Sequence, residues 1–347
     1  MQDNTQLSCI LWGDNMKYNI LAEVREDYPS LMDGTNVYND YVSKKSMLEF
    51  CEAINSLGFE CTFIGGMKAL FSIYQSHADT SDTIFINYNY GLPAPYKRTQ
   101  CPTLLELMGA KYSGADPFVA LLVNDKEYTK RVLRAAGICV PSSILVNHSE
   151  NIQYRVDKSK LSLPLVVKPN CEGSSLGITA ESLCNDYITA SKIANKLLPQ
   201  YREVLIEQYI AGYECTVWII GNPGDFRLVA PLLISEKGNF YFEHRIFTMQ
   251  DKATKVREYS LPDKTLGVDR VNELKQLSEK IFTELGLRDY ARIDFRISND
   301  HIFFIEANAL PIFSQTSEIG KITQLYDISY KKICELVIDT VTTRLMA

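Results

Sequence analysis

Apolar residues in the first third of the chain recur with the periods of alternating strands and helices. Residues 44–57 predict a helix, because apolar side chains stand three or four positions apart and Gly58 follows as a stop signal. Short apolar runs predict strands at residues 9–12, 59–64 and 83–86. This strand–helix–strand order is typical of a parallel sheet with crossover helices.

The middle third continues the alternation and reads as a second unit. Asn124 is expected to cap a helix that runs to Ala136. Further strands are predicted near Ile144 and at residues 164–168 and 204–209, with a helix over residues 182–198.

The last third holds longer strands, predicted at residues 216–220 and 226–234, and a helix over residues 269–285 with an apolar stripe. Residues 235–262 show few regular signals, which indicates a long loop of the kind that often serves as a lid. We therefore expect three domains, an N-terminal α/β domain over residues 1–115, a central domain over 116–209 and a C-terminal domain over 210–347.

A candidate phosphate-binding loop lies in the middle third. The apolar run Val166-Val167 delivers Lys168 and then breaks into the turn Gly173-Ser174-Ser175. Backbone N–H groups and hydroxyls in such a turn can donate to phosphate oxygens. The loop is not of the Walker type, because the lysine precedes the turn; an ordinary exit from a strand is the alternative reading.

A candidate metal site lies in the last third. Arg292, Asp294 and Arg296 alternate with apolar residues, and a turn at 298–300 separates them from a second predicted strand. On that strand Phe304, Glu306 and Asn308 are expected to share one face. A hairpin would bring Asp294 close to Glu306 and Asn308, three hard oxygen donors suited to Mg²⁺. The alternative reading is a solvated polar face.

Composition and charge narrow the class of protein. With 347 residues, 46% of them apolar and 22% charged, the chain is expected to fold into two or three soluble domains. A net charge of −6 argues against a nucleic-acid-binding surface. No apolar run approaches the roughly 20 residues of a membrane span, and the polar residues 1–6 lack a basic signal region. We therefore expect a cytoplasmic protein without a membrane partner.

Cysteine and histidine usage points away from disulfide, zinc and thiol chemistry. The nine cysteines are an odd number and include no Cys-x-x-Cys pair, and none of the four histidines has metal-ligand spacing. Cys171 lies within the candidate phosphate loop, but no histidine accompanies it nearby, so we do not interpret it as a nucleophile.

Taken in order, these segments resemble ATP-grasp carboxylate–amine ligases of the D-alanine–D-alanine ligase type. The resemblance runs from about Tyr38 to Ser317 and rests on the following segments: Ser113-Gly114-Ala115-Asp116, Asp125-Lys126 with Lys130, Lys168 to Ile178, Glu207 with Gly212 and Glu214, and Arg292 to Pro311. It implies an α/β ATP-grasp fold with an N-terminal Rossmann-like parallel sheet, a central α+β lid domain and a C-terminal α+β domain. It also leans toward a homodimer.

The resemblance implies a role for each matching residue. ATP would be held by the following residues: Lys126, Lys168, Ser174, Ser175, Leu176, Glu207, Ile210 and Glu214, with Glu207 and Glu214 at the adenine end and the ribose. Mg²⁺ or Mn²⁺ would be bound by Asp294, Glu306 and Asn308. Arg292 and Ser174 are implied as catalytic residues, and Arg292 would stabilise the transferring phosphoryl group. An ion pair with Asp294 or Glu306 is the alternative role for Arg292.

The segments implied to bind the amino-acid substrates depart from the ligases that make D-alanyl-D-alanine. Those ligases carry a His-Gly…Gly-Glu-Asp-Gly stretch where this chain has residues 87–98, and the place of an acidic N-terminal residue falls around Asp40 or Tyr41. Ser317 matches a residue that binds the carboxylate of the second substrate. Its neighbour Glu318 would repel a carboxylate or attract a cationic group.

The lid segment, residues 240–247, also lacks a clear match to the lid tyrosine of the family. His244 and Arg245 within it are candidates for substrate contact. The expected reaction is ATP-dependent amide-bond formation between amino-acid or small-peptide substrates through an acyl phosphate, with release of ADP and phosphate. Two alternatives stay open, namely a D-alanine–D-alanine ligase of cell-wall synthesis and a catalytically silent ATP-binding regulator.

Overall fold

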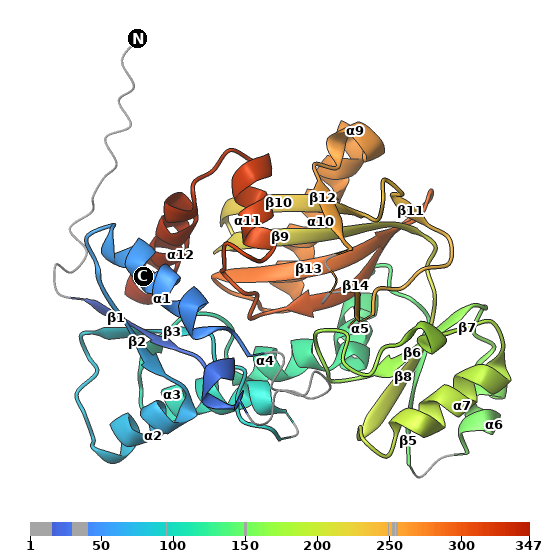
Figure 1. The fold of residues 1–347 in the computed structure, drawn as a ribbon, viewed down its shortest axis with the longest axis horizontal. Coiled ribbons are helices and arrows are strands. Elements are labelled where there is room, and N and C mark those ends of the chain that lie inside the picture. Colours follow the sequence, from blue (N-terminus) through green and yellow to red (C-terminus); the bar gives the residue numbers. More distant parts are fainter. Residues whose placement is uncertain are drawn as a thin grey trace.

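Three β-sheets follow one another along the chain, in blue, green and yellow to red in Figure 1. The computed structural model describes residues 16–29, 41–94, 96–148, 151–248, 250–251, 254 and 256–347. The predicted strand at residues 9–12 and the position Asp40 lie outside these residues. The mixed α/β architecture agrees with the fold predicted from the sequence.

The first sheet is parallel, with the strand order β2-β1-β3-β4. Its strands are β1 (Lys17–Leu21), β2 (Glu60–Gly65), β3 (Thr83–Asn87) and β4 (Lys111–Tyr112), and its helices are α1 (Lys44–Asn55), α2 (Met67–Gln75) and α3 (Gln100–Leu107). The predicted helix and the strands near residues 60 and 84 are confirmed. Strand β1 was not predicted, because Lys17 and Asn19 interrupt its apolar character.

The second sheet is antiparallel, with the order β5-β8-β6-β7. It consists of β5 (Ser143–Asn147), β6 (Leu165–Pro169), β7 (Leu183–Cys184) and β8 (Glu203–Gln208), with α6 (Ile152–Ser159) and α7 (Tyr187–Leu197) packed on it. The helix predicted from residue 182 begins five residues later, because Asp186 caps it through the amide of Thr189.

Two short helices precede this sheet where one was predicted. Asn124 ends α4 (Pro117–Asn124), and Asp125 is the residue that caps α5 (Lys126–Ala135), by accepting a hydrogen bond from the amide of Tyr128. The prediction that Asn124 is the cap is therefore wrong by one residue. The apolar residues of α4 pack against the third sheet.

The third sheet has six strands, with the path β12-β10-β9-β13-β14 and β11 paired with β9. The strands are β9 (Gly212–Asn222), β10 (Asp225–Ser235), β11 (Tyr241–Phe242), β12 (Glu258–Ser260), β13 (Tyr290–Ile297) and β14 (Ile302–Asn308). The helices that follow or interrupt them are α9 (Asp263–Leu266), α10 (Val268–Glu284), α11 (Glu318–Leu325) and α12 (Tyr330–Met346). The predicted helix and the long strands are confirmed.

The hydrophobic cores join parts of the chain that are distant in sequence. Helix α12, at the C-terminal end, packs beside α1, and its Val337 and Val341 share a core with Met47 and Ile54 (Figure 1). These contacts cross the predicted boundaries at residues 115 and 209, and we keep the three-domain division as a proposal. Among the helices of the described ranges, none has the length and apolar character needed to cross a membrane.

Candidate active site

A large cavity is lined by strands of both the second and the third sheet. On β13, Arg292, Asp294 and Arg296 share the cavity face, because they alternate with residues that point into the core. Strand β9 places Thr216 opposite Asp294 and Glu214 opposite Arg296. The side chains of neighbouring strands thus form one continuous charged and polar surface.

Strand β14 completes this surface but departs from strict alternation. Asp294 lies opposite Glu306, and the next residue of β13 lies opposite Phe304, so Ile305 is an extra, bulged residue. The bulge turns Phe304 into the apolar core, whereas Ile305, Glu306 and Asn308 line the cavity. The prediction that Phe304 shares a face with Glu306 and Asn308 is therefore wrong.

Two lysines hold the carboxylate of Glu207 in the opposite wall. Lys168 Nζ lies 2.5 Å from Glu207 Oε1 and Lys130 Nζ lies 2.5 Å from Oε2, and all three side chains are buried. Burial alone would raise the pKa of Glu207, but attraction to the two ammonium groups lowers it to about 2. Two cations and one anion leave this wall with net positive charge, which favours a bound phosphate.

The Gly/Ser turn after β6 has an uncommon backbone conformation. Ser174, Ser175 and Gly177 have φ values of 51°, 58° and 73°. A Cβ at Gly177 would lie 2.6 Å from Pro169 Cγ, so this position requires glycine. Turns of this kind form concave anion-binding arrays of N–H groups. The amide of Leu176 donates to Gly173 O at 3.0 Å, so a phosphate would compete with this turn bond.

Lys126 links the loop to the predicted metal ligands. Its Nζ donates to the carbonyl oxygen of Glu172 at 2.6 Å and lies 3.4 Å from Glu306 Oε2. The Glu172 carboxylate is paired in turn with Lys97 at 3.1 Å. The cavity wall therefore places an ammonium group between the phosphate loop and the carboxylates.

Arg292 forms a two-point ion pair with Asp294. Its Nε and Nη2 lie 3.0 and 2.9 Å from the two carboxylate oxygens, and its Nη1 lies 3.8 Å from Glu318 Oε1. Burial alone would lower the pKa of Arg292, but the neighbouring carboxylates of Asp294 and Glu318 raise it. The ion pair that the sequence analysis gave as the alternative role for Arg292 is therefore present. The catalytic role of Arg292 stays a prediction.

The oxygen donors predicted to hold Mg²⁺ lie together on this surface. Asp294 and Glu306 face each other across the β13–β14 pair, with the carboxamide of Asn308 two residues further on. Asp294 Oδ1 also accepts a hydrogen bond from Thr216 at 2.6 Å. Two carboxylates and an amide oxygen fit the hard-oxygen preference of Mg²⁺, so these residues would suit a metal that carries phosphate oxygens.

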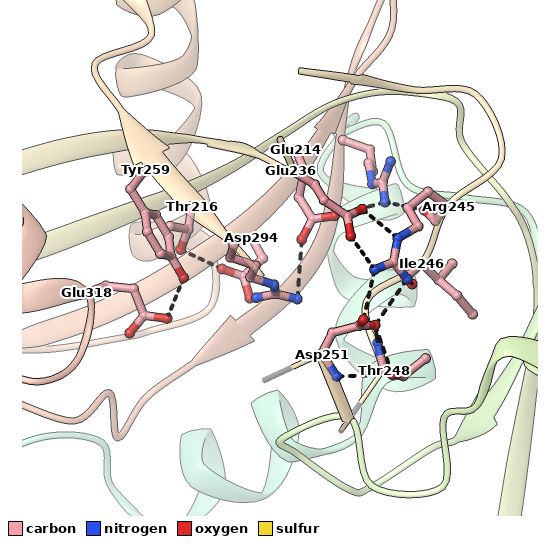
Figure 2. Close-up of polar contacts among 12 residues, drawn as sticks. Glu214, Thr216, Glu236, Arg245, Ile246, Thr248, Asp251, Tyr259, Asp294 and Glu318 are labelled. Carbon is pink, nitrogen blue, oxygen red and sulfur yellow. Dashed lines mark hydrogen bonds and ion pairs between the residues drawn. The ribbon is translucent and has the colours of Figure 1, made fainter. Parts of the chain in front are cut away.

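Ser317 and Glu318 line the cavity at the start of α11. The Ser317 hydroxyl lies 2.8 and 2.7 Å from carbonyl oxygens of the preceding turn, so it already carries local hydrogen bonds. Tyr259 donates to Glu318 at 3.4 Å. Figure 2 shows this pair at one end of a polar row that passes Thr216 and Asp294.

His244 and Arg245 lie apart from the cavity wall. Arg245 is held by Glu236 and Asp251, at 2.8 Å from each, as Figure 2 shows, and His244 is exposed. This geometry does not support the predicted substrate contacts, because the Arg245 guanidinium already has two carboxylate partners. The lid segment contributes the next two residues to the cavity instead, Ile246 and Phe247.

The divergent segment 87–98 reaches the cavity through Asn87, Tyr90 and Arg98. The Arg98 guanidinium lies 4.2 Å from the centroid of the Tyr90 ring, which is typical of a cation–π contact. Buried Tyr41, one of the two positions expected in place of an acidic residue, donates a hydrogen bond to the carbonyl oxygen of Gly91 at 2.8 Å. This bond holds the segment in position.

Three arginines without a role in the sequence analysis also line the cavity: Arg98, Arg257 and Arg296. The strand alternation around Asp294 was a signal for Arg296. Arg257 follows a long loop that contains no motif. Its position two residues before Tyr259, next to an edge strand, is the only signal in the sequence that the two side chains point the same way. Ile210, predicted at the nucleotide, lies buried in the same cavity.

Comparisons with known proteins agree with this geometry. The family model described as "D-ala D-ala ligase C-terminus" matches residues 132–339. The D-alanine–D-alanine ligase of Thermotoga petrophila is 27% identical over 297 residues, which cover 86% of this chain and 91% of that protein. The D-alanine–D-alanine ligase of Bordetella petrii is 30% identical over 240 residues, 67% of this chain and 69% of that one.

Solved structures show the same fold. The D-alanine–D-alanine ligase of Bacillus anthracis complexed with ATP superposes with a TM-score of 0.70 at 19% identity, covering 95% of this chain and 98% of that one. The VanG D-Ala:D-Ser ligase of Enterococcus faecalis gives 0.70 at 17% identity, covering 94% and 99%.

Fold, site and relatives together define an ATP-grasp ligase, an enzyme that forms a carbon–nitrogen bond and converts ATP to ADP. Because the family model matches more than half of its residues, the chain belongs to the D-alanine–D-alanine ligase family. The reading as a catalytically silent regulator is therefore set aside.

Proposed function

We propose that this protein is a D-alanine–D-alanine ligase. One observation carries the proposal: the phosphate loop with Lys126 and Lys168 faces the carboxylates Asp294 and Glu306 within a single cavity. The similarity to the Thermotoga petrophila ligase, which covers 91% of that protein, supports the same substrates. The expected homodimer and cytoplasmic location stay predictions.

The cavity residues suit activation of a carboxylate by phosphorylation. A carboxylate oxygen of the first substrate attacks the γ-phosphorus of ATP, and the bond to the β-phosphate oxygen breaks to release ADP. Lys126 and Lys168 bind the phosphates, and Arg292 stabilises charge on the transferring phosphoryl group. Mg²⁺ at Asp294, Glu306 and Asn308 would offset phosphate charge.

The acyl phosphate then reacts with the second substrate. Its amine attacks the acyl carbon, the carbon–oxygen bond to phosphate breaks, and the amine loses a proton as the amide forms. Arg292 is placed to stabilise the tetrahedral oxyanion. The reaction needs no covalent intermediate with the enzyme. Cys171 is not suited to form one, because burial raises the pKa of its thiol to about 12.

A second candidate is a ligase for a different pair of amino acids. Glu318 favours it, because a carboxylate that lines the cavity at the end of the polar row beside Tyr259 would disfavour a simple acceptor carboxylate and favour a cationic group. The divergent segment with Tyr90 and Arg98 favours it as well. ATP use and amide formation are common to both candidates.

Release of ADP and formation of dipeptide by the purified protein test the proposal. We expect turnover with Mg-ATP and D-alanine alone, with phosphate released in equal amount. Asp294→Asn combined with Glu306→Gln is the matched control, since it removes the two charges and keeps the shapes. Turnover with other amino acids but none with D-alanine would select the second candidate and refute the first.

A further inference from the structure

Arg257 is a cavity-lining arginine whose hydrogen-bonding capacity is only partly used. Its Nη2 lies 3.6 Å from Glu214 Oε1, a long ion pair, and Glu214 itself lies closer to Arg296, at 2.8 Å. Its Nε is buried and has no hydrogen-bond partner within the part of the chain that the structure describes. A guanidinium offers five N–H donors, and leaving buried donors unpaired is unfavourable.

Edge strand β12 of the third sheet places the Arg257 guanidinium on the proposed nucleotide side of the cavity. On β12, Tyr259 lies opposite Ile234, which in turn lies opposite Glu214 on β9. Arg257 is the residue that precedes β12, two positions before Tyr259, and its side chain lines the cavity. The guanidinium of Arg257 and the carboxylate of Glu214 thus line the same cavity, although Arg257 follows the lid segment in the chain and Glu214 precedes it.

The ring of Phe247 separates two guanidinium groups with different surroundings. Arg245 lies 4.9 Å from the ring centroid and Arg257 lies 4.4 Å from it. Arg245 has Glu236 and Asp251 as carboxylate partners (Figure 2). Arg257 contacts the ring and the hydroxyl of Tyr259, but among the described residues its only ion pair is the 3.6 Å contact with Glu214, so its charge is available to a ligand.

The charges around Arg257 keep it protonated. Burial alone would lower its pKa, but the carboxylates of Glu214, Asp294 and Glu318 and the hydroxyl of Tyr259 raise it. Asp294 is already bound by Arg292 and Thr216. An added oxygen anion would therefore find an arginine with unused donors.

The nucleotide supplies such an anion at this place. Glu214, the carboxylate paired with Arg257, is the residue expected at the ribose, and the phosphate chain begins at the ribose. We infer that Arg257 is a phosphate-binding residue, which holds the phosphate chain of the nucleotide from the edge of the third sheet. Lys126 and Lys168 bind the same chain from the other wall. The inference rests on the nucleotide site of the proposed function.

Calorimetric titration with three nucleotides tests this assignment. The ligands are adenosine, Mg-ADP and Mg-adenylyl imidodiphosphate, a non-hydrolysable ATP analogue. Arg257→Met keeps the apolar contact with Phe247 and removes the charge, Arg257→Lys keeps the charge without the fork, and Arg134→Met removes an exposed arginine as a control.

Arg257→Met is expected to weaken both phosphate-bearing ligands by about tenfold or more, as for a lost charge-assisted hydrogen bond. Adenosine is expected to bind as before, Arg257→Lys to recover part of the affinity, and Arg134→Met to match the wild type. Thermal unfolding of each variant shows that the fold is kept.

Equal affinity of the wild type and Arg257→Met for the ATP analogue would overturn the inference, and so would an equal loss for adenosine. These readings need no amino acid. If the protein binds the nucleotides but does not join D-alanine, the proposed function is refuted. The role of Arg257 can still be decided from the binding measurements.

Discussion

The two halves of the cavity, one proposed to bind the nucleotide and the other proposed to bind the amino acids, are built in different ways. In the nucleotide half, Lys130 and Lys168 meet Glu207 at 2.5 Å each, and the three side chains are buried. In the amino-acid half, Glu318 meets Tyr259 at 3.4 Å and Arg292 at 3.8 Å. The contacts of Glu207 form a closed network and are short, whereas those of Glu318 are longer.

Because of this difference, we expect one half to determine the stability of the fold and the other to determine substrate specificity. Short buried ion pairs are strongly coupled, so the loss of one partner leaves another charge buried without compensation. Longer contacts at a cavity wall contribute little to folding and can change with little cost. We therefore expect the nucleotide half to control whether the enzyme folds and binds ATP, and the amino-acid half to select substrates.

The largest effect is expected from Glu207→Leu, which breaks the closed network. The free energy of unfolding should fall by about 3–5 kcal/mol, because Lys130 and Lys168 lose their buried carboxylate partner. Urea unfolding measures it. Lys196→Met, which removes an exposed ion pair to Glu181, is the control and should change stability by less than about 1 kcal/mol. Equal effects of the two substitutions would remove the contrast between the halves.

Arg292→Lys tests the chemistry between the two halves. It keeps the charge but loses the two-point geometry, so kcat should fall roughly 10²- to 10³-fold with a smaller change in the KM for ATP. Steady-state ADP release measures both constants. A variant with unchanged kcat would restrict Arg292 to its ion pair with Asp294.

The pH dependence of stability sharpens the account of Glu207. Its pKa lies at about 2 in the folded protein, below the ordinary value of 4.5, so its stabilisation is present above pH 4.5 and is lost as pH falls toward 2. The stability advantage of the wild type over Glu207→Gln should shrink by about 2 kcal/mol between pH 6 and pH 3. Urea titrations at several pH values measure it, and a constant difference would contradict this account.

The smallest effect is expected from Glu318→Leu in the amino-acid half. Removal of the carboxylate should lower the KM for the second D-alanine by roughly fivefold, in line with about 1 kcal/mol of repulsion. Stability should change by less than about 0.5 kcal/mol. Glu318→Gln separates charge from size. A higher KM in both variants would show that Glu318 assists D-alanine binding and would remove its support for the second candidate function.

The sequence predicted which residues come together in the proposed nucleotide half better than in the proposed amino-acid half, for a physical reason. Lys168 and its turn are contiguous, and Asp294, Glu306 and Asn308 lie on two strands joined by a short turn, so local periodicity brings them together. Even there, the bulge at Ile305 escaped prediction, because an extra residue in a strand leaves no signal in the alternation of the other residues.

The amino-acid half combines side chains from segments that are far apart along the chain. Arg98 and Glu318 line the same cavity only through the packing of separate elements. Arg245 was predicted at the substrate because it lies in the lid segment, yet Glu236 and Asp251 bind it elsewhere. Spacing along a chain cannot indicate which of several arginines finds a carboxylate partner outside the cavity.

The central claim is that a substrate carboxylate is activated by phosphorylation in this cavity. D-alanine labelled with ¹⁸O in its carboxylate, incubated with Mg-ATP and the enzyme, tests it through mass spectrometry of the released phosphate. We predict one ¹⁸O atom in phosphate for each dipeptide formed, because an acyl phosphate passes its bridging oxygen to phosphate. Unlabelled phosphate alongside dipeptide would contradict the account.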